Sequence, residues 1–312
     1  DYTNITNVGL YMMAVVGAAR MDFITREDAL SRLILLLDTL DQLETRRGFF
    51  FNYYDTTTLE RTSNLISFVD SSWLTAGLMV IRSAYPELAT RASLLIDAMD
   101  YGWLYDDVEQ LMSHGYYVNL DYPSEYHYGM LYTETRTGSL IAIGKGDVPL
   151  EHWFRMHRTF PREERWQSQE PQNWQTRTID GHEVETGHYT WRGQAYVPSW
   201  GGSMFEALMP TLVVDEQRYA PDSLGLNNRR HVEIQRRFAT EELGYPVWGL
   251  SPSALAHVDG YSEFGVGPLG ARGYTGGVVT PHASMLALTI APQAATENLR
   301  ELARLYPVYG PY

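Results

Sequence analysis

The sequence contains no cysteine in its 312 residues. Disulfide bonds, thiolate nucleophiles and cysteine-based metal sites are therefore excluded, and the absence of cysteine leaves the cellular compartment open. Long hydrophobic runs are also missing. The longest one near the start, residues 8–19, has about a dozen residues, whereas a transmembrane helix needs about 20. We therefore predict no membrane segment in this chain.

Basic residues are scarce, since 24 Lys and Arg face 38 Asp and Glu and give a formal net charge of −14. Nucleic acids and anionic membrane surfaces are bound largely through Lys and Arg contacts to phosphates, so we predict neither as a partner. Aromatic residues are plentiful at 13%, including 8 Trp and 22 Tyr. Such a composition favours a neutral ligand with faces on which rings can stack, such as a sugar, although aromatics also fill cores.

Most familiar catalytic motifs are absent as well. The sequence has no HExxH and no GxSxG, and its His residues do not stand at metal-ligand spacing from carboxylates. Residues 265–270 match GxGxxG, but no strand–helix pattern surrounds them, so we predict a loop. We predict no metal and no cofactor. Carboxylates among aromatics remain, and glycoside hydrolysis uses a pair of them.

Hydrophobic periodicity predicts about ten or eleven helices, arranged in pairs and joined by loops that hold most of the Gly, Trp and carboxylates. One short helix is predicted near residues 108–112. This pattern indicates an all-α toroid, one domain over residues 1–312, with a site formed by loops on one face. Asp180-Gly181 between two β-rich runs predicts a β-hairpin inserted within residues 160–198.

Residues 127–155 carry the most informative charges. Glu134 stands close to Arg136 at the aromatic-lined start of a predicted helix. A buried carboxylate and guanidinium are costly unless they are paired or functional, so a structural Glu–Arg pair and a functional site are both open. Asp70 and Glu206 each fall in the first turn of a predicted helix, where capping is the structural alternative.

Six sequence blocks follow one another along nearly the whole chain. They are VDSSWL (69–74), HYGMLYTETR (127–136), AIGKGDVPLEHWFRM (142–156), SWGGSMFEALMP (199–210), WGLSPS (248–253) and TPHASMLAL (280–288). Together they resemble the glycoamylase-like domain of bacterial β-1,2-glucanases and of the cyclisation region of cyclic β-1,2-glucan synthases. The resemblance is closer to the synthase-associated branch.

This resemblance implies an (α/α)6 barrel that acts on β-1,2-glucan. Glu134 is similar to the family's acid and is our candidate general acid, and Glu206 resembles the second carboxylate of the synthase-associated branch. Asp70 stands where the glucanase branch tends to have Glu, and is the third catalytic candidate. A further family block is LYPVYG (305–310). The family usually continues beyond it with one more helical segment, which we expect to be absent from this chain. Inverting hydrolysis and retaining transfer both remain open.

Aromatic and polar side chains in and between these blocks are the candidates for substrate binding, with packing as the alternative for each. They are Asp55, Trp73, His127, Tyr128, Arg136, Trp200, Trp248, Tyr261, Glu263 and His282. We expect a hydrolase of β-glucan, most of all β-1,2-glucan, with an oligo- or polysaccharide as its partner. A transglycosylase that cyclises or remodels β-1,2-glucan and a non-catalytic glycan-binding protein are the alternatives. The expected substrate favours a periplasmic or secreted location, and the oligomeric state is not determined.

Overall fold

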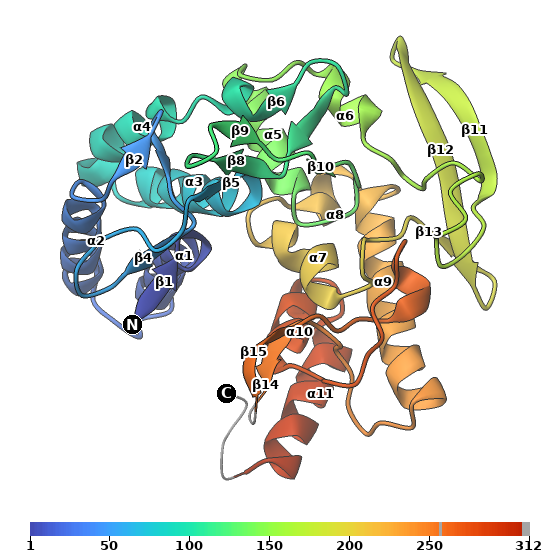
Figure 1. Ribbon diagram of the computed structural model, residues 1–312. Helices are drawn as coiled ribbons and strands as arrows, with labels where there is room; N and C mark the ends of the chain where they lie inside the picture. Colours follow the sequence, from blue (N-terminus) through green and yellow to red (C-terminus); the bar gives the residue numbers. More distant parts are fainter. Residues whose placement is uncertain (256–257, 308–312) are drawn as a thin grey trace. The chain divides into compact units, whose positions relative to one another are not determined.

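A computed structural model describes residues 1–255 and 258–307 of the chain. Contacts divide the chain into two compact units (Figure 1). The N-terminal unit comprises Asp1–Gly129 and Thr137–Trp153, and the C-terminal unit comprises Met130–Arg136 and Phe154–Tyr312. A single domain over residues 1–312 stays a prediction.

Helices make up most of the N-terminal unit. They are α1 (Ile5–Arg20), α2 (Arg26–Leu40), α3 (Phe68–Ala84), α4 (Ala89–Ala98), α5 (Arg136–Lys145) and α6 (Glu151–Arg155), the last two lying mostly in this unit. Helix α3 packs against α1 and α4 (Figure 1). Glycine permits the close approach of α1 and α3, because a Cβ on Gly77 would lie 2.5 Å from the carbonyl oxygen of Gly9.

Short antiparallel strands connect these helices. They are β1 (Tyr2–Asn4), β2 (Thr45–Arg46), β3 (Phe49–Phe50), β4 (Tyr53–Asp55), β5 (Leu65–Ser67), β6 (Tyr105–Asp106), β7 (Leu111–Ser113), β8 (Gly115–Tyr117), β9 (Tyr122–Pro123) and β10 (His127–Tyr128). Strand β1 pairs with β4, β2 with β3, β7 with both β6 and β10, and β8 with both β5 and β9.

The predicted helix near residues 108–112 is wrong. The carboxylate of Asp106 accepts hydrogen bonds from the backbone N–H groups of Val108 and Glu109, and Gln110 adopts φ 58°. These features make a turn, because a positive φ interrupts a right-handed helix and the Asp side chain satisfies the N–H groups locally. The chain then enters β7 at Leu111.

The C-terminal unit combines helices with two small sheets. Its helices are α7 (Met204–Leu208), α8 (Glu216–Tyr219), α9 (Leu224–Arg237), α10 (Pro281–Leu286) and α11 (Pro292–Leu305), and its strands are β11 (Gln172–Ile179), β12 (His182–Trp191), β13 (Gln194–Tyr196), β14 (Ser253–Leu255) and β15 (Val258–Ser262). The predicted hairpin is confirmed as β11 and β12, with β13 as a third strand. Asp180 and Gly181 at its tip both have positive φ, as a two-residue hairpin turn requires.

Helix α9 is central to the core of the C-terminal unit, since α7, α8 and β13 all pack against it (Figure 1). Val232 and Ile234 of α9 join a buried cluster with Met204, Leu208 and Tyr132. Glu206 lies in the first turn of α7, as predicted, and a loop over residues 199–203 precedes this helix.

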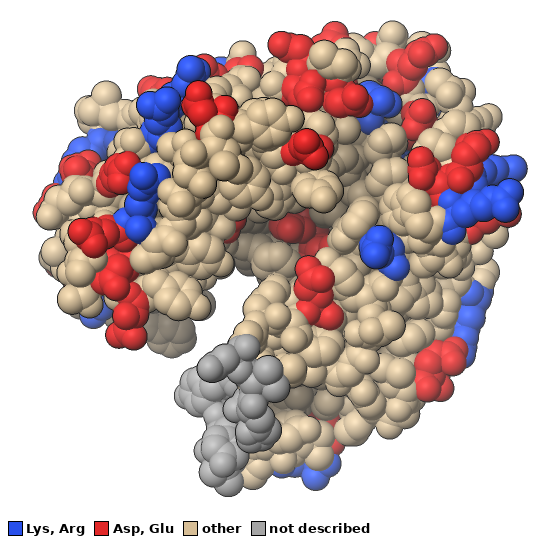
Figure 2. Space-filling model, in the orientation of Figure 1, with Lys and Arg blue, Asp and Glu red and all other residues tan. Residues whose placement is uncertain are grey.

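In the part of the chain that the structure describes, no helix combines the length and apolarity that crossing a bilayer requires. Figure 2 shows acidic and basic side chains interspersed on one face among a larger number of uncharged residues. We expect the family's last helical segment, which would follow residues 305–310, to be absent. Residues 308–310 lie outside the described residues.

Candidate active site

Glu206 occupies a capping box at the start of α7. Ser203 is the N-cap residue, and its hydroxyl accepts the backbone N–H of Glu206 at 3.2 Å. In return, Glu206 Oε2 accepts from the Ser203 N–H (3.0 Å), the Ser203 hydroxyl (2.8 Å) and the Ser199 hydroxyl (3.1 Å). The Gly201 N–H donates to both carboxylate oxygens, at 3.0 and 3.1 Å. Capping, the structural alternative for Glu206, therefore operates, and it also holds the carboxylate in one orientation.

The loop of residues 199–203 lies directly on a second loop, residues 265–274, which includes the GxGxxG match. Backbone hydrogen bonds join the two loops, running from Ser199 N to Leu269 O, from Ala271 N to Ser199 O, from Arg272 N to Trp200 O, from Tyr274 N to Gly201 O and from Val266 N to Gly202 O. A Cβ on Gly265 would lie 2.4 Å from the Gly201 carbonyl oxygen. Residues 265–270 thus form a loop, as predicted, and their glycines allow two backbones to touch.

Substituting Gly202 tests this loop contact. Gly202 has φ +78°, and a Cβ there would lie 2.1 Å from the Val266 carbonyl oxygen. We expect Gly202→Ala to lower the free energy of unfolding by more than about 2 kcal/mol, because a left-handed backbone is unfavourable for Ala and the loops must separate. Urea denaturation measures the loss.

Gly144→Ala is the matched control for this substitution. Gly144 lies within α5, and a Cβ there would meet no atom within 4 Å. We expect this change to raise stability by about 0.5–1 kcal/mol, because Ala favours helix over Gly. Equal effects of the two substitutions would contradict the loop contact.

Three carboxylates lie close enough to Tyr274 for their charges to act on its hydroxyl. This hydroxyl donates to Glu263 Oε1 at 3.2 Å. Burial raises the pKa of Tyr274, and the negative charges of Glu206, Glu263 and Glu134 raise it further. All four residues belong to the C-terminal unit. The structure therefore brings Glu134, Glu206 and Glu263, three predicted site residues, to one place.

Burial raises the pKa of Glu206 above the ordinary value for a glutamate, and its hydrogen bonds from Ser203, Gly201 and Ser199 oppose that rise. The side chain is 7% exposed, whereas Glu134 is half-buried. A carboxyl group with a raised pKa can hold a proton near neutral pH and deliver it to a leaving group. The environment of Glu206 thus suits a general acid.

Arg136 is fully buried, so its predicted role in substrate binding is wrong. Its guanidinium forms a bidentate pair with Glu216, with Nε–Oε1 2.7 Å and Nη2–Oε2 3.0 Å. Asn228 donates to Glu216 Oε2 at 2.8 Å and accepts from the Tyr132 hydroxyl at 2.5 Å. The structural ion pair that the sequence suggested exists, but its carboxylate comes from Glu216.

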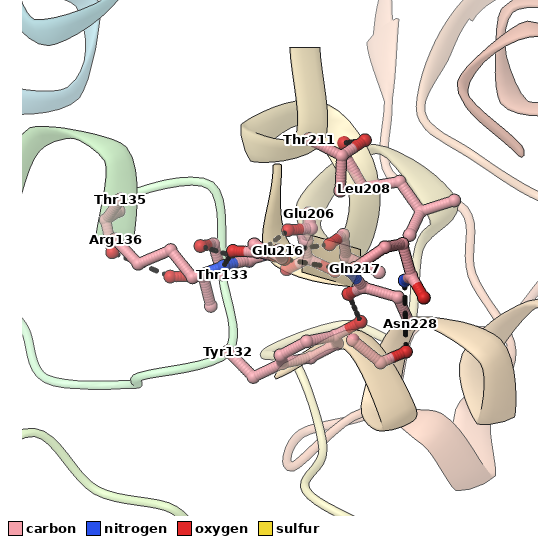
Figure 3. A network of polar contacts seen from close by, with 12 residues as sticks. Tyr132, Thr133, Thr135, Arg136, Glu206, Leu208, Thr211, Glu216, Gln217 and Asn228 are labelled. Atoms are coloured by element: carbon pink, nitrogen blue, oxygen red, sulfur yellow. Dashed lines mark hydrogen bonds and ion pairs between the residues drawn. The ribbon is translucent and has the colours of Figure 1, made fainter. Parts of the chain in front are cut away.

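The same guanidinium joins the segments that carry Glu134 and Glu206. Arg136 Nη1 donates to the carbonyl oxygen of Thr133 at 2.8 Å and to that of Glu206 at 3.4 Å, and Nη2 donates to the carbonyl oxygen of Ala207 at 2.7 Å. Figure 3 shows Arg136 between these groups. Arg136 therefore links the backbone next to Glu134 to the backbone of α7 at Glu206 and Ala207.

Sequence reasoning missed Glu216, Asn228 and Tyr274. Glu216 lies 80 residues from Arg136, and no spacing rule connects the two. One sequence feature could have drawn attention to Tyr274, because this residue follows a Gly-rich stretch in the same loop as the GxGxxG match. That signal indicates a loop and says nothing of the loop's neighbours.

Trp200 is half-buried and belongs to an aromatic cluster with Trp166 and Phe160. The Trp200 and Trp166 ring centroids are 5.6 Å apart, and Trp166 is 41% exposed. Tyr261 is 66% exposed, and Glu263 and His282 are also exposed. These side chains of the C-terminal unit remain accessible to a ligand.

Trp73 and Trp248 were predicted to bind substrate, and both predictions are wrong because the two side chains belong to the core. Trp73 is 1% exposed within α3, and Trp248 is 4% exposed in the core of the C-terminal unit. A buried indole has no free face for a sugar ring to cover. At these two positions the residues of the sequence blocks serve packing of the core.

The remaining predicted residues belong to the N-terminal unit. Asp70, in the first turn of α3, accepts from the Thr6 hydroxyl at 2.7 Å. The Asp55 carboxylate accepts the N–H groups of residues 57 and 58 in a turn, which lower its pKa. His127 Nε2 lies 3.0 Å from Asp106 Oδ2, and the Tyr128 ring packs against Phe68 and His114. Roles for these four residues in catalysis or binding stay predictions.

No group of three or more His, Asp and Glu side chains within residues 1–255 and 258–307 has the geometry to hold a metal ion.

Residues 126–312 match the model of the Glycoamylase family, which carries the description "Putative glucoamylase". The chain belongs to this family. It is 33% identical over 223 residues to the cyclic β-(1,2)-glucan synthase NdvB of Rhizobium meliloti (strain 1021). That match covers 69% of this chain and 7% of the synthase, so the chain spans a small part of the relative's length.

Solved structures share the fold. The endo-β-1,2-glucanase from Chitinophaga pinensis has a TM-score of 0.69 at 18% identity, with 95% of this chain and 71% of that chain covered. The β-1,2-glucanase from Parabacteroides distasonis has a TM-score of 0.78 at 19% identity, with 98% and 46% covered. These likenesses confirm the predicted fold class, the largely helical (α/α)6 type.

Proposed function

We propose that this protein is a carbohydrate-active enzyme that cleaves β-1,2-glucan by carboxylate acid/base catalysis. The observation that carries the proposal is the gathering of Glu134, Glu206 and Glu263 around Tyr274 in the C-terminal unit. Glycosidic bonds are cleaved by a pair of carboxyl groups in different protonation states. The substrate class rests on the similarity to the synthase from R. meliloti and to the glucanase from C. pinensis, which was solved with sophorotriose and glucose.

In this proposal Glu206 is the general acid. Its burial raises its pKa, and its Oε1 accepts one hydrogen bond while Oε2 accepts several. The Oε1 atom is therefore the better placed oxygen to carry the proton to the glycosidic oxygen. Glu134 is the second carboxylate, acting as a base on water or as a nucleophile. These roles exchange those implied by the family resemblance, which assigns the acid to Glu134.

Incubating the protein with linear β-1,2-glucan tests the proposal, with products followed by chromatography. Shorter oligosaccharides from the wild type, absent with Glu134→Gln, are the expected result. NMR of the first-formed anomer then separates inversion from retention. No change in β-1,2-glucan at high enzyme concentration would overturn the substrate assignment, and parallel reactions with β-1,3- and β-1,4-glucans would identify another linkage.

Transglycosylation of the same glucan is the second candidate, favoured by the 33% identity to a cyclic β-(1,2)-glucan synthase. Both reactions use the same carboxylates and differ in whether water or a sugar hydroxyl accepts the glucosyl group. Mass spectrometry of the products decides between them. Rings lack the mass of one water relative to linear chains of equal length, and transfer to a labelled acceptor gives chains longer than the acceptor.

A further inference from the structure

The ring of Tyr274 lies against the backbone of Gly201. A Cβ built on Gly201 would lie 2.0 Å from two carbon atoms of the Tyr274 ring and 2.6 Å from a third. The Tyr274 N–H also donates to the Gly201 carbonyl oxygen at 2.9 Å. Glycine at position 201 thus makes room for this ring.

Backbone conformation gives no separate reason for glycine at position 201. Gly201 does not have a positive φ, in contrast to Gly202. An alanine at 201 would therefore be unstrained in its backbone, and its methyl group would collide with Tyr274. The geometry connects position 201 to Tyr274.

The hydroxyl of Tyr274 lies where negative charge is concentrated. It donates to Glu263 Oε1 at 3.2 Å, and Glu206 and Glu134 are close enough for their charges to act on it. A phenol surrounded by carboxylates keeps its proton and remains a neutral donor. It can therefore orient one carboxylate without neutralising the charge of a neighbouring one. A Lys or Arg at this place would neutralise that charge.

Glu263 is exposed and has two oxygens, and one of them is held by Tyr274. The other oxygen can accept hydrogen bonds from the hydroxyls of a glucosyl ring. A long, mobile side chain loses less entropy on binding when a neighbour already holds it.

We propose that Tyr274 is a positioning residue of the active site, seated on Gly201 so that its neutral hydroxyl orients Glu263 toward the hydroxyl groups of the bound glucan. This inference rests on the proposed function and adds two residues, Tyr274 and Gly201, to the predicted site.

The first test is Tyr274→Phe, which keeps the ring on Gly201 and removes the hydroxyl. We expect the dissociation constant for a β-1,2-gluco-oligosaccharide to rise about tenfold, the size expected when a hydrogen bond to a charged group is lost. Calorimetry in the Glu134→Gln background measures binding without turnover. In the active enzyme the loss should fall more on KM than on kcat, because the lost interaction serves binding. Tyr219→Phe, at a tyrosine 73% exposed elsewhere in the C-terminal unit, is the matched control.

The second test is a double-mutant cycle between positions 201 and 274. Gly201→Ala should weaken binding at least as much as Tyr274→Phe, because the new methyl group displaces the whole ring. Tyr274→Ala vacates that space, so Gly201→Ala should add no further loss in the Tyr274→Ala background. Thermal denaturation of each variant identifies any that fails to fold.

The outcomes separate this inference from the proposed function. If the wild type and Glu134→Gln neither bind nor cleave β-1,2-glucan, the proposed function fails and the inference fails with it. If the wild type binds and cleaves the glucan but Tyr274→Phe binds as tightly as wild type, only the inference is overturned. Additive losses at 201 and 274 would overturn the seating of Tyr274 on Gly201.

Discussion

Replacing Glu206 by Gln is expected to lower kcat on β-1,2-glucan by about 100- to 10,000-fold, the range that general acid catalysis contributes. The amide has no acidic proton that it could transfer to the leaving oxygen. Glutamine can still form the reciprocal hydrogen bonds of a capping box with Ser203, so the start of α7 should persist. The loss would therefore reflect chemistry and not unfolding. Initial rates together with urea denaturation of the same preparation measure both.

The pH profile provides an independent readout of this role. Because burial raises the pKa of Glu206, the carboxyl group is protonated and active below that pKa and loses its proton as pH rises through it. We therefore expect kcat/KM to fall as the pH rises through the pKa of Glu206. This alkaline decrease should be absent from the pH profile of the residual activity of Glu206→Gln.

Glu301→Gln is the control for these measurements. Glu301 lies in α11 of the C-terminal unit and pairs with Arg304. We expect it to keep wild-type activity. A Glu206→Gln variant that retains wild-type kcat would remove Glu206 from the mechanism.

Arg136→Met is expected to lower the free energy of unfolding by about 3–5 kcal/mol, the cost of leaving one partner of a buried ion pair unpaired. Arg136 and Glu216 are 0% and 1% exposed, so water cannot solvate the carboxylate that remains. The variant also loses the hydrogen bonds from Arg136 to Thr133, Glu206 and Ala207. Both stability and turnover should therefore decrease, as measured by urea denaturation and initial rates.

The double variant Arg136→Met/Glu216→Leu separates the two effects. Replacing both charges by apolar groups removes the stranded carboxylate, so much of the stability should return. Turnover should remain low, because no guanidinium then connects the carbonyl groups next to Glu134 and Glu206. Full recovery of turnover would contradict the positioning role. Arg304→Met, which breaks an exposed pair with Glu301, should cost less than about 1 kcal/mol.

Local signals in the sequence predicted many of the secondary structure elements. The Asp180-Gly181 turn acts between residues a few positions apart, so it can be recognised without the fold. The helix predicted near residues 108–112 failed for a local reason too, because the side chain of Asp106 caps a turn in which Gln110 adopts positive φ. The ordered blocks also led to the family that the match over residues 126–312 confirms.

By itself the sequence determined the available chemistry, which is that of carboxylates without thiols, and the candidates Glu134 and Glu206. The tertiary structure decided which charges meet. It paired Arg136 with Glu216, buried Trp73 and Trp248, and brought Tyr274 to Glu263. The physical reason is that burial and long-range ion pairs depend on how distant segments pack. A residue's type and its near neighbours cannot specify a partner 80 positions away.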